Sequence, residues 1–285
     1  MIDEITPLIL TYNEAANIGR ALSHLRWARD IVVVDSFSDD DTLRIARAFP
    51  QVRIFQRKFD LHAAQWNYGL TQTGIETDWV MALDADFIIS DALLAQIKAI
   101  TLDDDTIAFR APFIFCIGGQ PVRCAICPPA TFLFKRDCGE YFQDGHTQKL
   151  QLRYGSIQSL KAPIFHDDRK PIERWLLSQQ RYAQLEAQKL RTTPWRRQDA
   201  ADRLRRLRIV APIAMGLYGL LVRRALFDGW PGIFYVCQRV IAELLLSLNL
   251  LSFDLPEHQS VTARMASLLS FIDARVPAAR EQVAE

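Results

Sequence analysis

The first hundred residues alternate short apolar runs with amphipathic stretches. Runs at residues 5–10, 31–35, 52–56 and 79–83 are short and largely apolar, so each predicts a β-strand. Apolar residues recur at helical spacing over 15–25 and 43–49. Strands that alternate with helices are typical of a parallel sheet covered on both faces. The pattern therefore predicts a Rossmann-like α/β half, whose ligands bind beyond the carboxyl ends of the strands.

Polar residues at the strand ends suggest how these two helices begin. Thr11 and Glu14 have the spacing of a capping box, and Ser38 is placed to cap the second helix.

From about residue 106 the chain becomes richer in Phe, Pro and Cys. Two runs there, 107–115 and 131–135, predict extended structure. Residues 171–191 predict a helix that starts with Pro171, a residue favoured in the first turn. We expect a nucleotide-binding and catalytic domain over 1–160, with the acceptor side in its second half. A mainly helical region is expected over 161–285.

The expected helical region has sequence features typical of segments that contact a membrane surface. Seven arginines lie between Arg191 and Arg208, followed by the uncharged run 209–222 and a second apolar stretch after "FDGWPG". Neither clearly reaches the roughly 20 residues that span a bilayer. An arginine-rich flank beside such a segment is typical of a helix lying in the membrane interface. A buried helical hairpin is the alternative, and the sequence leaves both open.

Composition restricts the classes of function. With 285 residues, 49% of them hydrophobic, the chain can bury a real core, and its net charge of +1 gives no field that favours nucleic acid. No cationic stretch precedes the first apolar run, so we expect no signal peptide and a cytoplasmic site, at the inner face of the inner membrane. The chain has five cysteines, and an odd number in a compartment that we expect to be reducing argues against a disulfide framework. Four of them could in principle bind structural zinc, although their spacing is unusual: Cys116, Cys124, Cys127 and Cys138.

The strongest chemical signal is "WVMALDAD", a strand-like run that ends in Asp84 and Asp86. Their period-two spacing places both carboxylates on one side of the chain. Hard oxygen ligands suit Mg²⁺ or Mn²⁺, and such a cation can bridge a diphosphate. His166, after an apolar pair in "IFHDD", could complete the metal shell, since imidazole also suits Mn²⁺. A structural, hydrogen-bonded histidine is the alternative.

Two other strand ends carry polar loops. In "DSFSDDDT", Asp35 and the hydroxyls after it could receive a base imide or ribose hydroxyls, and an ordinary helix cap is the alternative. The loop "LTYNEAAN" supplies donors and acceptors but no G-x-G-x-x-G, which disfavours a dinucleotide site. The candidate nucleotide-binding residues at these strand ends are Thr11, Tyr12, Asn13, Glu14, Asp35, Ser36 and Asp84.

These motifs together resemble glycosyltransferase family 2, and more narrowly its branch of bacterial lipopolysaccharide-core glucosyltransferases of the WaaE type. The matching segments are "LTYNEAANIGRAL", "IVVVDSFSDDDT", "FDLHAAQWNYGL" and "DWVMALDAD", in family order. The resemblance implies a GT-A fold and an inverting, metal-dependent transfer from a nucleotide-sugar, with UDP as the default. It implies that Thr11, Glu14, Asp35 and Asp39 hold the nucleoside, that Asn67 sits beside the diphosphate, and that Asp86 ligates the metal directly.

The sequence departs from the family at two positions. Trp66 stands where many relatives carry an arginine, and Lys58 or Arg57 could substitute for that cation. Relatives tend to show His-Glu after a glycine, whereas "DGHTQ" places Thr147 at the glutamate position. Inversion by direct displacement needs a group that takes the acceptor proton. Asp144 is the first candidate for this base and His146 is the second.

The predicted function is transfer of a sugar to a glycan or lipid-linked acceptor in cell-envelope polysaccharide or lipopolysaccharide synthesis. A non-catalytic membrane-surface adaptor with a degenerate fold is the alternative from another class. A haloacid dehalogenase-type phosphatase also uses D-x-D, but near its N-terminus and with Thr or Val where Ile88 stands here. A nucleotidyltransferase needs a Gly-rich basic loop after the first strand, where this chain has acid.

Overall fold

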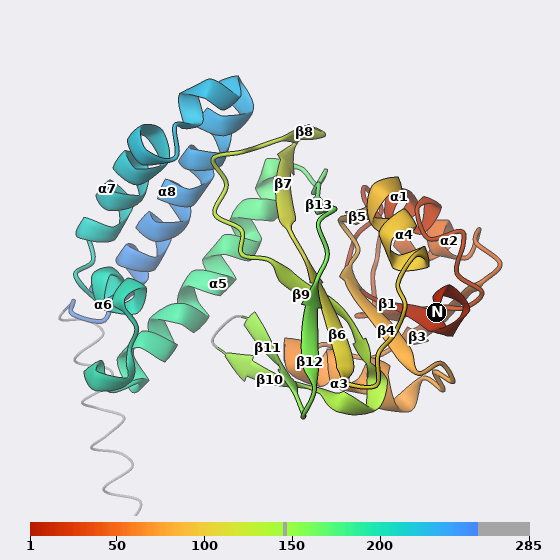
Figure 1. Ribbon diagram of the computed structural model, residues 1–285. Helices are drawn as coiled ribbons and strands as arrows, with labels where there is room; N and C mark the ends of the chain where they lie inside the picture. The colour runs from red at the N-terminus through yellow and green to blue at the C-terminus, as the bar shows by residue number, and fades with distance from the viewer. Residues whose placement is uncertain (145–146, 256–285) are drawn as a thin grey trace, which may run out of the picture.

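A computed structural model describes residues 1–144 and 147–255 of the chain (Figure 1). Its centre is a seven-stranded sheet with the order β12-β6-β9-β4-β1-β2-β3. β1, β2, β3 and β4 run parallel, and β9 is antiparallel to both β4 and β6. The strands span Ile5–Thr11 (β1), Ile31–Asp35 (β2), Val52–Gln56 (β3), Trp79–Asp84 (β4), Thr106–Ala111 (β6), Ala130–Lys135 (β9) and Ser156–Ser159 (β12).

Helices cover both faces of this sheet, because alternate residues of each strand point to opposite sides. In β1, Ile9 packs in the cluster that includes α1 and α4, whereas Leu8 packs in the cluster that includes α3. Gly69 brings α3 close to β1: a Cβ there would lie 2.7 Å from Leu8 Cδ1. These helices span Ile18–Ser23 (α1), Thr42–Ala46 (α2), His62–Gln72 (α3) and Asp91–Lys98 (α4).

Two smaller sheets flank the tip of β4. One has the order β5-β13-β7-β8, and the other is the antiparallel hairpin β10–β11. Asn67 of α3 fixes the hairpin, since its side-chain amide exchanges two 2.9 Å hydrogen bonds with the backbone of Tyr141. The strands span Phe87–Ile89 (β5), Phe113–Ile117 (β7), Gln120–Pro121 (β8), Gly139–Asp144 (β10), Thr147–Leu152 (β11) and Ile164–His166 (β13).

The C-terminal part is helical and lies to one side of the sheet (Figure 1). Ala187 and Leu190 of α5 pack with Leu246 and Leu250 of α8. The elements are α5 (Ile172–Thr192), α6 (Ala200–Arg206), α7 (Val210–Leu217), a π-helical turn η4 (Tyr218–Val222) and α8 (Gly229–Ser252). Short 3₁₀ turns occupy Ile2–Glu4 (η1), Arg136–Cys138 (η2), Trp195–Arg197 (η3) and Ala225–Asp228 (η5).

The predicted α/β class is confirmed, and the four predicted N-terminal strands lie where the pattern placed them. Both capping predictions are wrong. Thr11 lies in β1 and its hydroxyl donates to Asp35 at 3.1 Å, while the Ser38 hydroxyl also donates to Asp35. The two hydroxyls instead donate to a buried carboxylate, and hydrogen bonds to a charged acceptor are strong.

The length predicted for the second C-terminal apolar stretch is also wrong. Residues Ala225–Ser252 form one helical segment that is long and apolar enough to cross a membrane by length and composition alone. The two charged residues of α8 itself, Arg239 and Glu243, face one another at 3.9 Å, and Glu243 also binds Arg205 of α6. Charges that pair inside a helical bundle do not interrupt the helix that carries them.

Candidate nucleotide and cation site

The carboxyl ends of β1 and β2 meet at a buried aspartate. Asp35 is fully buried, and its oxygens accept hydrogen bonds from the Thr11 hydroxyl, the Ser38 hydroxyl and backbone N–H, and the Gln56 amide. These four bonds occupy the carboxylate, which is the arrangement a buried charge requires. Asp35 therefore orders the loop that follows β2.

That loop is tied to the loop after β1. The backbone N–H of Asn13 donates to Ser38 Oγ at 2.8 Å, and the Asn13 side chain accepts from the backbone of Asp39 at 2.9 Å. Asn13 and Phe37 both have left-handed backbones, with φ of 55° and 60°. A non-glycine residue in this region carries strain that the surroundings must impose. Tyr12 follows the end of β1 and Phe37 lies just beyond the end of β2, which pairs with β1. Both aromatic side chains are about half exposed.

Buried Gln65 supports the same edge from α3. Its amide donates to Ser36 Oγ at 2.9 Å, and its oxygen accepts from Arg57 at 2.6 Å. Arg57 is further held by both oxygens of Asp60. Sequence reasoning missed Gln65, because a polar residue inside an amphipathic helix resembles any solvent-facing position. The contacts of Arg57 also show that this candidate phosphate cation already has two partners.

Asp84 ends β4, and Asp86 lies in the turn that leads to β5. His166 Nε2 lies 3.0 Å from Asp86 Oδ2 because β13 pairs with β5 and sets His166 opposite Phe87. Burial and the charge of Asp86 raise the pKa of Asp84 to about 6. Burial would also raise the pKa of Asp86, but the His166 imidazole outweighs it and the pKa is lowered. Burial opposes the charged form of His166 as well, yet Asp86 raises its pKa.

The segment after His166 adds a second charged group to the site. Lys170 binds Glu14 and lies 3.4 Å from Asp168, and its side chain is only 18% exposed. Burial raises the pKa of Glu14 to about 7, although Lys170 opposes this shift. The charges of Glu14 and Asp86 outweigh burial and raise the pKa of Lys170. No sequence signal marked Lys170 beyond its place in "HDDRK", because Glu14 and Asp86, which act on it most strongly, lie more than 80 residues away along the chain.

Helix α5 brings Tyr182 close to the charged groups of this site. Burial and the charge of Asp84 raise the pKa of Tyr182, whose hydroxyl is also within reach of the charges of Lys170 and Asp86. Tyr182 is therefore a further residue of the site that sequence reasoning treated only as part of an amphipathic helix.

The two candidates for the base lie on the hairpin β10–β11. Asp144 ends β10, where Lys149 Nζ approaches it to 2.5 Å and Lys189 of α5 to 3.2 Å. Hydrogen bonds from Lys149 and then Lys189 outweigh partial burial and lower the pKa of Asp144. His146 lies outside the described residues, as the side chain of Thr147 does.

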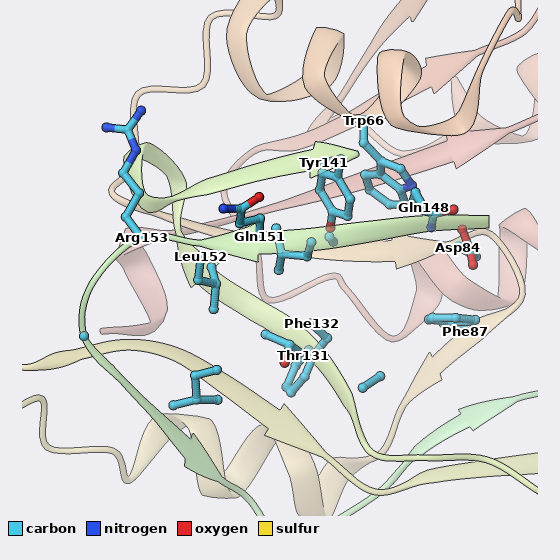
Figure 2. Close-up of a pocket in the computed structure, with 15 residues that line it drawn as sticks. Trp66, Asp84, Phe87, Thr131, Phe132, Tyr141, Gln148, Gln151, Leu152 and Arg153 are labelled. Carbon is cyan, nitrogen blue, oxygen red and sulfur yellow. The ribbon is translucent and has the colours of Figure 1, made fainter. Parts of the chain in front are cut away.

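A cavity of about 700 Å³ opens beside Asp84, between the hairpin and the main sheet (Figure 2). Trp66 and Tyr141 form one wall as a stacked pair, with ring centroids 5.3 Å apart. Trp66 thus replaces the family's arginine with an aromatic ring that is buried in this wall. Asn67, expected beside the diphosphate, uses both ends of its amide on the backbone of Tyr141.

The residues at the tip of β4 fit a divalent cation. Asp86 Oδ1 is buried and has no hydrogen-bond partner within the described part of the chain. An unpartnered carboxylate oxygen in such a place is costly unless something positive binds it. Within residues 1–144 and 147–255, no three His, Cys, Asp or Glu side chains form a ready metal cage. Nucleotide-bound Mg²⁺ commonly takes only one or two carboxylates and fills its shell with phosphates and water.

The zinc hypothesis finds no support in the packing of the cysteines. Cys124 and Cys127 pack in the cluster with Tyr235 of α8, whereas Cys138 packs against the α3 side of the main sheet.

Comparison with known proteins adds a family to this geometry. Residues 8–137 match the model of glycosyl transferase family 2. This segment is similar to that family over somewhat less than half of the chain. It contains the loops after β1 and β2, helix α3 and the Asp84–Asp86 turn. The GT-A-like character of the predicted fold agrees with this match.

Curated relatives are similar to part of the chain. An uncharacterized glycosyltransferase of Rickettsia felis is 31% identical over 100 residues, which are 35% of this chain and 34% of the relative. One of Rickettsia bellii is 32% identical over 98 residues, 34% and 32% of the two chains. The chain spans about a third of the length of the curated relatives it matches.

Solved structures resemble the chain at low sequence identity. The mannosyltransferase PcManGT of Pyrobaculum calidifontis, in complex with GDP-Man and Mn²⁺, is 18% identical with a TM-score of 0.49, covering 86% of this chain and 87% of that one. Glucosyl-3-phosphoglycerate synthase of Mycobacterium tuberculosis is 17% identical with a TM-score of 0.46, covering 66% and 79%.

Proposed function

We propose that the protein is an inverting glycosyltransferase that moves a sugar from a nucleoside-diphosphate donor to a glycan or lipid-linked acceptor. The observation that carries this proposal is the convergence of three strand ends of the family 2 segment on one edge. The Thr11 and Asp35 loops, the Asp84–Asp86 turn and the Lys170 ammonium all meet there. A ligand with a polar base end and an anionic diphosphate end matches this arrangement.

In this proposal the nucleoside lies against the ordered loops after β1 and β2. Ser36 and Asp39 present polar groups on these loops, which Thr11 and Asn13 hold in place from buried positions. The half-exposed rings of Tyr12 and Phe37 offer stacking faces for the base. Asp35 contributes by fixing the loop that presents them. UDP remains the default nucleotide, and the cell-envelope or lipopolysaccharide pathway of the WaaE-type branch remains the proposed context.

Asp86 and His166 would hold a divalent cation, Mg²⁺ or Mn²⁺, with Asp84 beside them. When bound, such a cation neutralises the charge that develops on the departing diphosphate. Lys170 places a fixed positive charge at the same edge, a role the family's arginine could have had at position 66. Asp144, or else His146, would take the proton of the acceptor hydroxyl.

We further propose that the C-terminal helices contact a membrane as a peripheral surface, at the cytoplasmic face of the inner membrane. Large apolar side chains are exposed from the end of α7 to the start of α8, including Leu221, Phe227 and Trp230 at 70%, 85% and 81%. Such a patch is unusual on a monomer unless it binds something. The arginines of α6 and of the turn before it add the positive charge that anionic lipids attract.

A thermal-shift screen tests the donor site. UDP and GDP are added to the protein with and without MnCl₂, and a ligand that binds the native state raises the melting temperature. We expect a metal-dependent rise for the wild type and none for Asp86→Ala. Asp78→Ala is the matched control, since this exposed aspartate lies just before the opposite end of β4. An Asp86→Ala protein that keeps the full metal-dependent rise would refute the cation site.

A further inference from the structure

The cavity beside Asp84 has a wall chemistry that distinguishes among acceptors. Four aromatic rings line it, contributed by Trp66, Phe87, Phe132 and Tyr141. Thr131 and Gln148 add a hydroxyl and an amide. Its volume of about 700 Å³ lies within the range of small-molecule sites, roughly 300–1,000 Å³. Aromatic faces with a few neutral hydrogen-bonding groups suit a ligand that is apolar on its faces and hydroxylated at its rim.

Charge is scarce in this lining. Among the described residues that line the cavity, Asp84 is the acidic one and Arg153 the basic one. The Tyr141 phenol is the other ionisable group. Figure 2 shows Gln148 and Asp84 at one end, and Arg153 at the other end with its guanidinium directed away. Gln148, Leu150 and Leu152 share one face of β11, and Arg153 follows the end of that strand. Within this lining, an anionic ligand would therefore meet the carboxylate of Asp84 and no cationic side chain directed at it.

The position of the cavity assigns it to the acceptor. In the sheet order, β4 lies between the nucleoside strands β1 and β2 on one side and the cavity strands β9 and β6 on the other. Direct displacement requires the nucleophile to approach the anomeric carbon from the side opposite the leaving diphosphate. A ligand in the cavity lies across Asp84 from the nucleoside, as that approach needs.

We propose that this cavity is the acceptor subsite and that it takes an uncharged sugar ring, not a phosphorylated or carboxylated one. The identification of this sugar as the acceptor rests on the proposed glycosyl transfer. The preference for a neutral sugar rests on the lining alone.

Ligand-observed NMR tests the preference in the presence of Mg²⁺ and UDP or GDP. The probes are the methyl glycosides of glucose, galactose and mannose, each compared with its 6-phosphate. We expect at least one neutral glycoside to bind about tenfold more tightly than its phosphate. Equal or tighter binding of the phosphates, or binding of none of the six, would overturn the proposal.

Two variants of Gln148 locate the binding. Gln148→Leu removes the amide next to Asp84 and should weaken the neutral glycoside about tenfold. Gln148→Lys places a cation there and should shift the preference toward the phosphate by about the same factor, because opposite charges attract strongly in a partly dry site. Gln72→Leu and Gln72→Lys, at the exposed end of α3, are the controls and should change neither affinity. Unchanged preferences in both Gln148 variants would place the sugar elsewhere.

The same samples separate this inference from the proposed function. Nucleotide melting shifts should be equal in the wild type and the Gln148 variants, which lie outside the nucleoside loops. If sugars bind with the expected preference but no nucleotide binds, the donor proposal fails while the neutral-sugar cavity stands. If nucleotides bind and the preference is absent, the cavity proposal fails alone.

Discussion

At the residue scale, Asp144 is a carboxylate whose basicity is set by two lysines. Hydrogen bonds from Lys149 and Lys189 hold its pKa below the ordinary value for aspartate. A low pKa keeps the group ionised and able to accept a proton at neutral pH, although it makes the group a weaker base. The side chain of Lys149 is 74% exposed, so it can be removed without disturbing the core.

If Asp144 is the base, Lys149→Ala should move the acid limb of the kcat profile to higher pH. Loss of the cation raises the pKa of the carboxyl, so protonation begins to inactivate the enzyme at a pH where the wild type is still active. The measurement is kcat against pH with a nucleotide-sugar that the thermal-shift screen identifies. Lys98→Ala, at the exposed end of α4, should leave the limb in place. An unmoved limb in Lys149→Ala would transfer the role away from Asp144, with His146 as the next candidate.

The sequence alone indicated the acidic residues of the candidate site but not its lysine. Asp84 and Asp86 could be predicted because their spacing and the apolar run before them are local in the sequence. His166 was predicted as a ligand candidate from its own surroundings. Lys170 and Tyr182 could not be found in this way, because each acquires its role only through partners on distant elements. Asn67 was expected at the diphosphate, yet its amide is used to hold the hairpin.

At the scale of elements, α3 connects the two halves of the site. Gln65 steadies the loop after β2, Trp66 lines the cavity and Asn67 holds β10, all within one helical turn. The helix can serve both sides because Gly69 lets it lie close on Leu8 of β1.

Gly69→Ala should destabilise the protein by about 1–3 kcal/mol, the usual cost of overpacking a core. The new Cβ would meet Leu8, which is fully buried and cannot move aside, and this outweighs the gain of about 1 kcal/mol from alanine's helix propensity. Urea denaturation measures the difference. Gly216→Ala in α7 is the control, because its Cβ would lie at an ordinary 3.5 Å from Val240 and should be neutral or stabilising. Equal stability of the two variants would contradict the close approach.

Strand positions in the N-terminal half could be predicted because the hydrophobic period is a local property of the chain. Val52–Gln56 was found although it contains an arginine, since the flanking polar loops marked its limits. The sheet order could not be read from this pattern. Insertion of β9 between β4 and β6 depends on antiparallel pairing with β6, 19–26 residues earlier in the chain, and with β4, 52–56 residues earlier. The short strands β5 and β13 are likewise set by their partners.

At the scale of the whole molecule, the exposed apolar patch and the candidate nucleotide site lie on different parts of the fold, with α5 between the α7–α8 pair and the main sheet (Figure 1). A protein that rests on lipid through this pair would keep its strand ends available to soluble nucleotides. The sequence pattern left two alternatives open here, a helix in the membrane interface and a buried hairpin, because exposure depends on how α7 and α8 pack.

Replacing both Phe227 and Trp230 by serine should abolish cosedimentation with vesicles that contain phosphatidylglycerol. These rings are more than four-fifths exposed, so their loss removes apolar area for the bilayer without opening a cavity in the protein. Tyr154→Ser is the control, since Tyr154 is 90% exposed at a position between β11 and β12. We expect wild-type binding to weaken as salt increases, because arginine contributes to it. Equal sedimentation of all three proteins would exclude the patch as the membrane contact.

The pairing of β13 with β5 has a consequence for how the protein is made. Asp86 emerges from the ribosome 80 residues before the histidine that contacts it. The sheet around Asp84 can begin to form early, since domains start to fold during synthesis, but the acidic turn stays without its imidazole until the strand at 164–166 has docked. A chain cut short before that strand would therefore carry Asp86 without the imidazole that lies 3.0 Å from it.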